Sequence, residues 1–170
     1  GGSLMRPEAT GYGTVYFAQE MLSTRGQELA GKRVSVSGSG NVAQYAVEKA
    51  MQLGATVVTV SDSGGTVYDP AGFTPEKLAQ LMEIKNERYG RASEYAALVG
   101  AQFLADQQPW SIPVDIALPC ATQNELDENH ARTLIQNGVL CVAEGANMPC
   151  TNEAAKVFEE AGVLYAPGKA

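Results

Sequence analysis

Apolar residues recur along this chain at two different spacings, and their alternation predicts a regular succession of helices and strands. Val15, Ala18 and Leu22 recur at the spacing of one helix face. Residues Thr56–Ser61 are almost wholly apolar or β-branched, which is typical of a parallel strand covered on both faces. The repeated β-α-β order predicts an α/β fold with a doubly wound, mostly parallel sheet and helices on both faces.

Glycine, proline and capping residues set the expected limits of these elements. The predicted helices run from Pro7 to Gly26, over Asn41–Leu53, from Pro75 to near Gly90, and over Ala92–Val99, Asp127–Asn137 and Asn152–Ala161. The predicted strands are Arg33–Ser37, Thr56–Ser61, Val114–Leu118, Val139–Ala143 and Val163–Tyr165, with Ala101–Leu104 as a further candidate. The breakers Gly64-Gly65, Asp69-Pro70 and Gly72 predict a loop after the second strand. No linker interrupts the pattern, so residues 1–170 are expected to form one domain.

The first strand runs directly into Gly38-Ser39-Gly40-Asn41-Val42-Ala43, which opens a helix. This Gly-x-Gly-x-x-Ala pattern between strand and helix is typical of a Rossmann-like dinucleotide-binding unit. Gly38 permits a tight turn, and Gly40 lets a pyrophosphate approach the backbone. The amide groups at the start of the helix then face the phosphates. A glycine-rich turn without any ligand is the alternative interpretation.

An acidic residue, Asp62, ends the second strand. In dinucleotide-binding units an acid at this position accepts hydrogen bonds from the adenosine ribose, which favours NAD. An Asp that only caps a loop turn is the alternative. A carboxylate repels a 2′-phosphate, but NADP binding tolerates a protonated or turned-away Asp62 if two or three bases offset it.

A basic set follows in the sequence and favours NADP instead. Lys85, Arg88 and Arg91 are spaced by three residues, and Ser63 next to the acid offers a hydroxyl. Charge-assisted contacts contribute roughly 1.5–3 kcal/mol each, so two of them outweigh one partly solvated repulsion. The alternative is that the bases only complement the dipole at the end of a helix.

Three further segments carry candidate chemistry. Gly11 and Gly13 lie within the first predicted helix, where each costs about 1 kcal/mol against Ala, so they indicate close approach by a ligand or by a second helix. Residues 119–125 and 144–149 each follow a predicted strand, at the edge where open α/β sheets bind ligands. Simple polar loops are the alternative for both.

Composition excludes several classes of partner. The 19 acidic and 12 basic residues give a net charge of −7, which repels nucleic acid and anionic membrane surfaces. No apolar run approaches the roughly 20 residues of a membrane span. We therefore expect no nucleic acid and no membrane among the partners, and a small-molecule cofactor as the ligand.

The cysteines and the single histidine point to an intracellular protein without a metal. Cys120, Cys141 and Cys150 are odd in number and lack Cys-x-x-Cys spacing, so reduced thiols in a cytoplasmic protein are expected. His130 stands alone, which argues against a histidine-based metal site. The first residues do not have the pattern of a signal peptide. Cys120 has no neighbouring base and is a poor candidate nucleophile.

Four motifs in fixed order resemble those of one family. They are Gly2-Ser3-Leu4-Met5-Arg6-Pro7-Glu8-Ala9-Thr10-Gly11-Tyr12-Gly13, Ser35-Val36-Ser37-Gly38-Ser39-Gly40-Asn41-Val42-Ala43, Leu118-Pro119-Cys120-Ala121-Thr122-Gln123-Asn124-Glu125 and Ala143-Glu144-Gly145-Ala146-Asn147-Met148-Pro149. They closely resemble the coenzyme domain of the hexameric glutamate dehydrogenases. The segment Gln107-Gln108-Pro109-Trp110 is similar to the NADP-type bacterial branch. The resemblance covers the whole chain.

The resemblance implies reversible oxidative deamination of L-glutamate to 2-oxoglutarate and ammonia, with hydride transfer to NADP. It implies NADP rather than NAD as the cofactor, and a homohexameric parent. The positions that it implies for cofactor contacts are Arg6, Thr10 and Asn147 near the nicotinamide, Gly38, Ser39, Gly40, Asn41 and Val42 at the pyrophosphate, Ala121 and Thr122 along the cleft, and Ser63, Lys85, Arg88 and Arg91 around the 2′-phosphate.

The family's catalytic lysines and aspartate belong to a substrate domain that precedes these motifs. That domain is not matched in these residues, so the chain is expected to be a coenzyme domain that binds NADP(H) without turnover. L-glutamate and 2-oxoglutarate would bind only together with the substrate domain. Two alternatives remain: the coenzyme domain of a leucine, phenylalanine or valine dehydrogenase, and a non-catalytic nucleotide-binding module.

Overall fold

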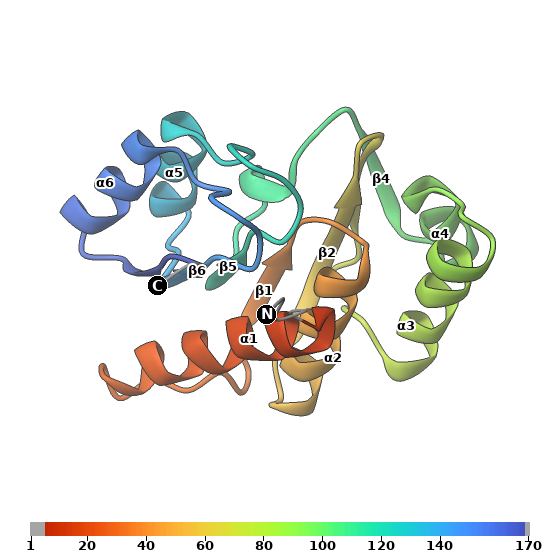
Figure 1. Ribbon diagram of the computed structural model, residues 1–170, viewed down its shortest axis with the longest axis horizontal. Helices are drawn as coiled ribbons and strands as arrows, with labels where there is room; N and C mark the ends of the chain where they lie inside the picture. Colours follow the sequence, from red (N-terminus) through yellow and green to blue (C-terminus); the bar gives the residue numbers. More distant parts are fainter. Residues whose placement is uncertain (1–5, 169–170) are drawn as a thin grey trace, which may run out of the picture.

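The computed structural model describes residues 6–168, and their strands form a seven-stranded sheet in the order β4-β3-β2-β1-β5-β6-β7 (Figure 1). The strands are β1 (Arg33–Val36), β2 (Thr56–Asp62), β3 (Gly65–Tyr68), β4 (Gln102–Ala105), β5 (Ile116–Leu118), β6 (Cys141–Ala143) and β7 (Leu164–Ala166). The helices are α1 (Pro7–Ser23), α2 (Asn41–Gln52), α3 (Pro75–Met82), α4 (Ala92–Val99), α5 (Glu128–Gln136) and α6 (Asn152–Glu160). A π-helical turn, η1 (Glu83–Glu87), continues α3, and a short 3₁₀ helix, η2 (Pro109–Ser111), precedes β5.

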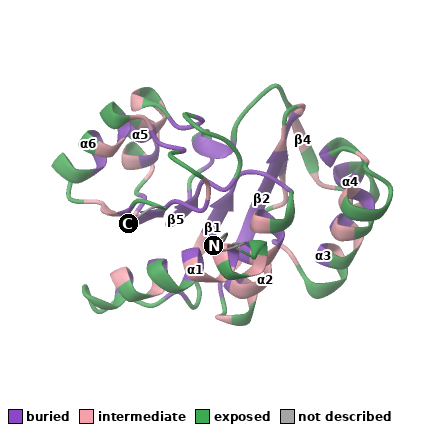
Figure 2. Cartoon of the chain, viewed as in Figure 1, coloured by how far each residue is buried: buried purple, intermediate pink, exposed green. Residues whose placement is uncertain are grey.

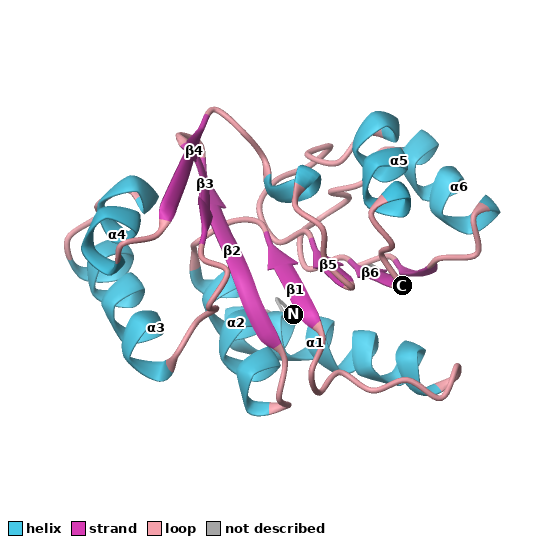
Figure 3. Ribbon diagram, turned by 180° about the vertical axis from the view of Figure 1, so that it is seen from behind, coloured by secondary structure: helices cyan, strands magenta, loops and turns pink. Residues whose placement is uncertain are grey.

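The expected doubly wound, mostly parallel sheet is confirmed. β1, β2, β5, β6 and β7 run parallel to one another, whereas β3 and β4 are antiparallel to their neighbours (Figure 3). Strand β1 lies between β2 and β5, so the chain winds away from it in both directions. Such a switch point is where α/β sheets open a crevice at their carboxyl ends.

The prediction of a loop directly after β2 is wrong, because strand β3 follows there. Asp62 pairs with Gly65 across the two residues Ser63 and Gly64, so β2 and β3 form a tight hairpin. Gly65 has φ +149°, and a Cβ at this position would collide with the carbonyl oxygen of Leu104 on β4. The glycines that indicated a loop are the residues that allow a hairpin turn and close strand contact.

Two apolar clusters hold helices to the two faces of the sheet. The first contains side chains from α1 to α4, among them Val15, Leu81 and Tyr95. The second lies under α5, α6 and η2, and its largest member is Trp110, which is fully buried. Figure 2 shows the central strands buried between these layers while the outer helix faces remain exposed.

The sequence signals at the helix ends are largely confirmed. The Thr74 hydroxyl accepts a hydrogen bond of 3.2 Å from the amide of Lys77 and so caps α3, directly before the predicted start at Pro75. The third helix changes at Met82 into the π-helical turn, which the sequence did not indicate. A Cβ at Gly11 would lie 2.7 Å from the carbonyl oxygen of Val42, so Gly11 serves close packing of α1 on α2. None of the described helices is long and apolar enough to span a bilayer.

Candidate functional site

A cavity of about 710 Å³ opens at the carboxyl ends of β1, β2 and β5, where the sheet changes winding direction. It is lined by the predicted residues Gly38, Ser39, Gly40, Asn41, Val42, Asp62, Ser63, Lys85, Ala121 and Thr122, together with Ser61, Gly65, Asp106, Gln107, Gln108, Cys120 and Glu125. Segments from five different parts of the chain therefore meet at one place. The predicted residues Arg6, Thr10, Arg88, Arg91 and Asn147 do not line this cavity.

Gly38 is required by the protein itself. Its φ of +86° lies in the left-handed region, and a Cβ would lie 2.9 Å from the carbonyl oxygen of Cys120. Its amide donates to the Ser61 hydroxyl at 2.8 Å, and its carbonyl accepts from the Ser61 amide at 3.0 Å. The glycine turn is thus held between β2 on one side and the segment after β5 on the other.

Gly40 differs, because nothing in the protein requires glycine there. Its φ is −80°, and a Cβ would meet no atom within 4 Å. It is the N-cap residue of α2, and no side chain caps that helix. The amides that begin α2 therefore open onto the cavity with the positive end of the helix dipole. A residue without a side chain at this point leaves room for a ligand rather than for another part of the chain.

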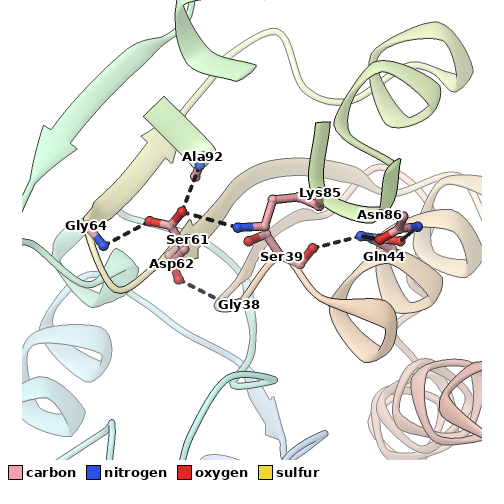
Figure 4. A network of polar contacts seen from close by, with 9 residues as sticks. All are labelled: Gly38, Ser39, Gln44, Ser61, Asp62, Gly64, Lys85, Asn86 and Ala92. Carbon is pink, nitrogen blue, oxygen red and sulfur yellow. Dashed lines mark hydrogen bonds and ion pairs between the residues drawn. The ribbon is translucent and has the colours of Figure 1, made fainter. Parts of the chain in front are cut away.

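Asp62 is turned toward protein donors and is ionised. Its carboxylate accepts from the amide of Ala92 at 2.7 Å, from the amide of Gly64 at 2.9 Å and from Lys85 Nζ at 3.3 Å (Figure 4). Burial by itself would raise the pKa of Asp62, but the two amides and the lysine outweigh it and lower the pKa. The lowered pKa argues against the expected alternative of a protonated Asp62. Asp62 borders the cavity, but its carboxylate oxygens are directed to three protein donors, in line with the alternative of a carboxylate turned from the ligand.

The basic set divides into one residue in the cavity and two outside it. Lys85 comes from the π-helical turn, and its side chain is 19% exposed and paired with Asp62. An ammonium group has three donors, so this ion pair leaves others for a phosphate. Arg88 and Arg91 are exposed on the surface beside α4 and do not line the cavity.

A pair of side-chain amides, missed by sequence reasoning, connects the turn that carries Lys85 to the glycine turn. Gln44 on α2 is 1% exposed, and its side chain exchanges hydrogen bonds of 3.0 Å in both directions with Asn86 (Figure 4). Gln44 also donates to the carbonyl oxygen of Ser39 at 2.8 Å. A single polar residue on the apolar side of the α2 pattern was the available signal.

Glu125 is a second residue that sequence reasoning missed as a site residue. It is 5% exposed, and its carboxylate accepts from the amides of Ala121 and Thr122 at 2.9 and 3.1 Å. Burial raises the pKa of Glu125, although these amides and the Ser37 hydroxyl act in the opposite direction. The amides of Ala121 and Thr122 are therefore bonded to the Glu125 carboxylate of the same loop.

The three residues predicted to lie near the nicotinamide are outside the large cavity. Thr10 lines a smaller cavity of about 180 Å³ between α1, the end of β6 and residues 166–168. Asn147 is exposed in the loop after β6, and Arg6 is exposed with its guanidinium 3.7 Å from Glu8. The structure does not bring these three residues into the large cavity.

The three cysteines are buried and unpaired. Burial raises the pKa of each thiol, to about 12 for Cys141. Thiols held in this way are poor nucleophiles, as expected for Cys120. Among the described residues no group of histidine, cysteine and carboxylate side chains is arranged to hold a metal ion.

Comparison with known proteins places these features in one family. The model of the glutamate/leucine/phenylalanine/valine dehydrogenases matches residues 1–170, the whole chain. The chain belongs to this family. The resemblance read from the four motifs is thereby confirmed.

Relatives within the family include enzymes from enteric bacteria. The chain is 68% identical over 170 residues to the NADP-specific glutamate dehydrogenase of Salmonella typhimurium and 66% identical to that of Escherichia coli K12. Each match covers 100% of this chain and 38% of the relative. The chain thus spans 38% of the length of these curated relatives.

Solved structures of the family share the fold. The crystal structure of Plasmodium falciparum glutamate dehydrogenase matches with a TM-score of 0.93 at 46% identity, covering 100% of this chain and 37% of that one. A hetero-hexameric glutamate dehydrogenase from Thermus thermophilus matches with a TM-score of 0.72 at 27% identity, over 99% of this chain and 37% of that one. The sheet, with its antiparallel β2-β3-β4 end, therefore belongs to a known architecture.

Proposed function

We propose that residues 1–170 form the NADP(H)-binding domain of a glutamate dehydrogenase. The observation that carries this proposal is Gly40: its backbone needs no glycine, no protein atom lies within 4 Å of its Cβ position, and it borders the large cavity. Gly-x-Gly-x-x-Ala turns use such a glycine to admit a pyrophosphate. The uncapped start of α2 supplies the amides that hold it.

The side chains around the second strand support NADP over NAD. Lys85 and Ser63 both line the cavity, and Lys85 keeps donors beyond its ion pair with Asp62. Because Asp62 already accepts three hydrogen bonds from protein groups, it is poorly placed to select a ribose hydroxyl. Relatives at 66–68% identity are named NADP-specific, and one at 59%, from Xylanibacter ruminicola, is named NAD(P)-specific. NAD is therefore the weaker alternative.

The reaction proposed for the whole enzyme is the reversible oxidative deamination of L-glutamate to 2-oxoglutarate and ammonia. The bound nicotinamide supplies the acceptor for hydride. This chain's own part is to bind and orient the dinucleotide through the glycine turn, the start of α2 and the loop at Ala121 and Thr122. Thr10 and Asn147 lie on the side of β6, toward which the family resemblance directs the nicotinamide.

The substrate, partners and assembly follow from the family and are part of the proposal. The catalytic lysines and aspartate that the resemblance implies are not matched in these residues, so the 170-residue chain is expected to bind cofactor without turnover. L-glutamate or 2-oxoglutarate would bind together with the substrate domain, in a parent that is a homohexamer. Names at 66–68% identity favour glutamate over the leucine, phenylalanine and valine substrates of the wider family.

A titration of the chain with NADPH, NADH and ADP-ribose tests the proposal. We expect NADPH to bind most tightly, as seen by calorimetry or by the change in dihydronicotinamide fluorescence. An affinity that does not depend on the nicotinamide would favour a nucleotide-sensing module. Appreciable turnover of glutamate by the 170-residue chain would contradict the division of labour proposed for the two domains.

A further inference from the structure

The cavity has two walls that come from distant parts of the chain. One wall is the glycine turn after β1, and the other is the loop of residues 119–125 after β5. They touch at Gly38, where the absent Cβ leaves room for the carbonyl oxygen of Cys120. The distance between these walls sets the width available to a dinucleotide, so a group that ties them together controls the shape of the site.

Two buried groups, the Ser37 hydroxyl and the Glu125 carboxylate, hold this loop. Ser37 lies directly before the glycine turn, and its hydroxyl oxygen accepts the amide of Cys120 at 2.9 Å. Glu125 accepts the next two amides of the loop, those of Ala121 and Thr122, at 2.9 and 3.1 Å. Three consecutive amides of the loop are thus bonded to protein, the first to a residue beside the turn and the other two to Glu125.

Glu125 is itself anchored in the protein interior. Its side chain is 5% exposed, and its main-chain carbonyl accepts a hydrogen bond of 3.3 Å from the indole of the fully buried Trp110. The two loop amides bond to a single carboxylate oxygen. They are therefore withdrawn from any ligand, while Ala121 and Thr122 themselves still line the cavity. The loop meets a ligand in a conformation that Glu125 imposes.

We propose that Glu125 is a positioning residue of the dinucleotide site, which fixes the conformation that the loop at Ala121 and Thr122 presents to the cavity. This inference rests on the proposed function, and it adds a residue that acts on the cofactor through the loop. A side chain that filled the same volume without a charged acceptor would leave the two loop amides less firmly held.

The charge of Glu125 could also act on the cofactor directly, with an effect on binding opposite to that of positioning. A buried carboxylate beside a diphosphate is repulsive, and removing its charge would strengthen cofactor binding if repulsion dominated. If positioning dominates, removal of the charge-assisted acceptor weakens binding by roughly tenfold, the equivalent of one such hydrogen bond. The two effects differ in sign, so one substitution distinguishes them.

The test uses Glu125→Gln, with Glu128→Gln as a matched control. Glu128 lies three residues away, is about half exposed and pairs with Arg132 on the surface of α5, so its substitution removes the same charge without touching the cavity. We expect Glu125→Gln to weaken NADPH binding roughly tenfold and Glu128→Gln to leave it within about twofold. Unfolding curves for both variants show that the compared proteins are folded.

A cofactor-free readout keeps the inference separate from the proposed function. In the wild type the amides of Ala121 and Thr122 should exchange slowly with solvent, and Glu125→Gln should increase their exchange more than Glu128→Gln does. Ser37→Ala should weaken NADPH binding less than additively when combined with Glu125→Gln, because the two substitutions release neighbouring amides of the same loop.

The outcomes of these measurements distinguish the proposed function from the positioning role of Glu125. Failure of the wild type to bind NADPH would overturn the proposed function. A wild type that binds, together with a Glu125→Gln variant that binds as tightly or more tightly, would overturn the positioning role alone. Additive effects of Ser37→Ala and Glu125→Gln, or unchanged amide exchange at Ala121 and Thr122, would also overturn it.

Discussion

The side-chain amides of Gln44 and Asn86 exchange two hydrogen bonds of 3.0 Å across the boundary between α2 and the π-helical turn η1 (Figure 4). Gln44 is buried and also holds the carbonyl oxygen of Ser39, so the pair connects the glycine turn to the turn that carries Lys85. The phosphate-facing backbone and the candidate 2′-phosphate ligand are therefore parts of one hydrogen-bonded unit. π-helical turns often occur at functional sites, and here the turn supplies Lys85.

Replacing Gln44 by Met should show how much this pair contributes to stability and to NADPH binding. The substitution keeps the volume but leaves the Ser39 carbonyl without its partner, so we expect the free energy of unfolding to fall by about 1–3 kcal/mol. NADPH affinity should fall as well, because both the turn and Lys85 lose their connection. Urea unfolding and NADPH titration measure the two effects. Asn86→Ala removes the same pair from its exposed side but leaves the bond from Gln44 to the Ser39 carbonyl, so a larger loss of stability there than at Gln44 would contradict this account.

The two glycines of the turn should respond to alanine in opposite ways. Gly38→Ala forces a side chain into a left-handed conformation beside Cys120 and should destabilise the fold by about 1–3 kcal/mol. Gly40→Ala should change the free energy of unfolding by about 1 kcal/mol or less, since only an N-cap residue changes. It should nevertheless abolish detectable binding of both NADPH and NADH. Thermal unfolding and cofactor titration of the two variants provide the comparison, and a Gly40→Ala variant with wild-type affinity would contradict the pyrophosphate assignment.

Lys85 should determine the preference for NADPH. Lys85→Ala removes a charge-assisted contact worth roughly 1.5–3 kcal/mol, so NADPH affinity should fall by tenfold or more while NADH affinity changes little. Arg88→Ala and Arg91→Ala are matched controls, because these exposed bases do not line the cavity. Parallel titrations with both cofactors measure the ratio. Equal losses for NADPH and NADH at Lys85 would instead assign the lysine to fixing Asp62.

Asp62 should stabilise the fold in a pH-dependent way. Its pKa is lowered in the folded state, so its contribution is present above the unfolded value of about 3.9 and is lost as the pH falls through the folded pKa. Asp62→Asn should therefore reduce the free energy of unfolding by about 1 kcal/mol at neutral pH, and the difference from wild type should shrink below pH 4.

Chemical denaturation across this pH range measures the Asp62 effect. Asp106→Asn is a suitable control, since this exposed residue borders the same cavity and its substitution makes the same change in charge. A gap between Asp62→Asn and wild type that stays constant down to the acid range would show that the hydrogen bonds of the carboxylate do not depend on its charge.

The amino-acid sequence alone determined the order of elements, the doubly wound class, the glycine turn and the family. These features depend on residues that are close in sequence: apolar periodicity within a helix or strand, Thr74 before α3, and the six residues from Gly38 to Ala43. The hairpin into β3 was also encoded locally, at Ser63 and Gly64, but its glycines resembled loop breakers. Local signals of this kind require no knowledge of how distant segments meet.

Only the tertiary structure decided which side chains share the site and in what state. Gln44 finds Asn86 42 residues away, and the amide of Cys120 meets the Ser37 hydroxyl across 83 residues. The pKa of Asp62 is lowered because the start of α4 and Lys85 are folded against it, which no spacing revealed. The physical reason is that hydrogen bonding and pKa depend on burial and on partners brought together by packing, whereas periodicity and turn formation depend on the backbone preferences of neighbouring residues.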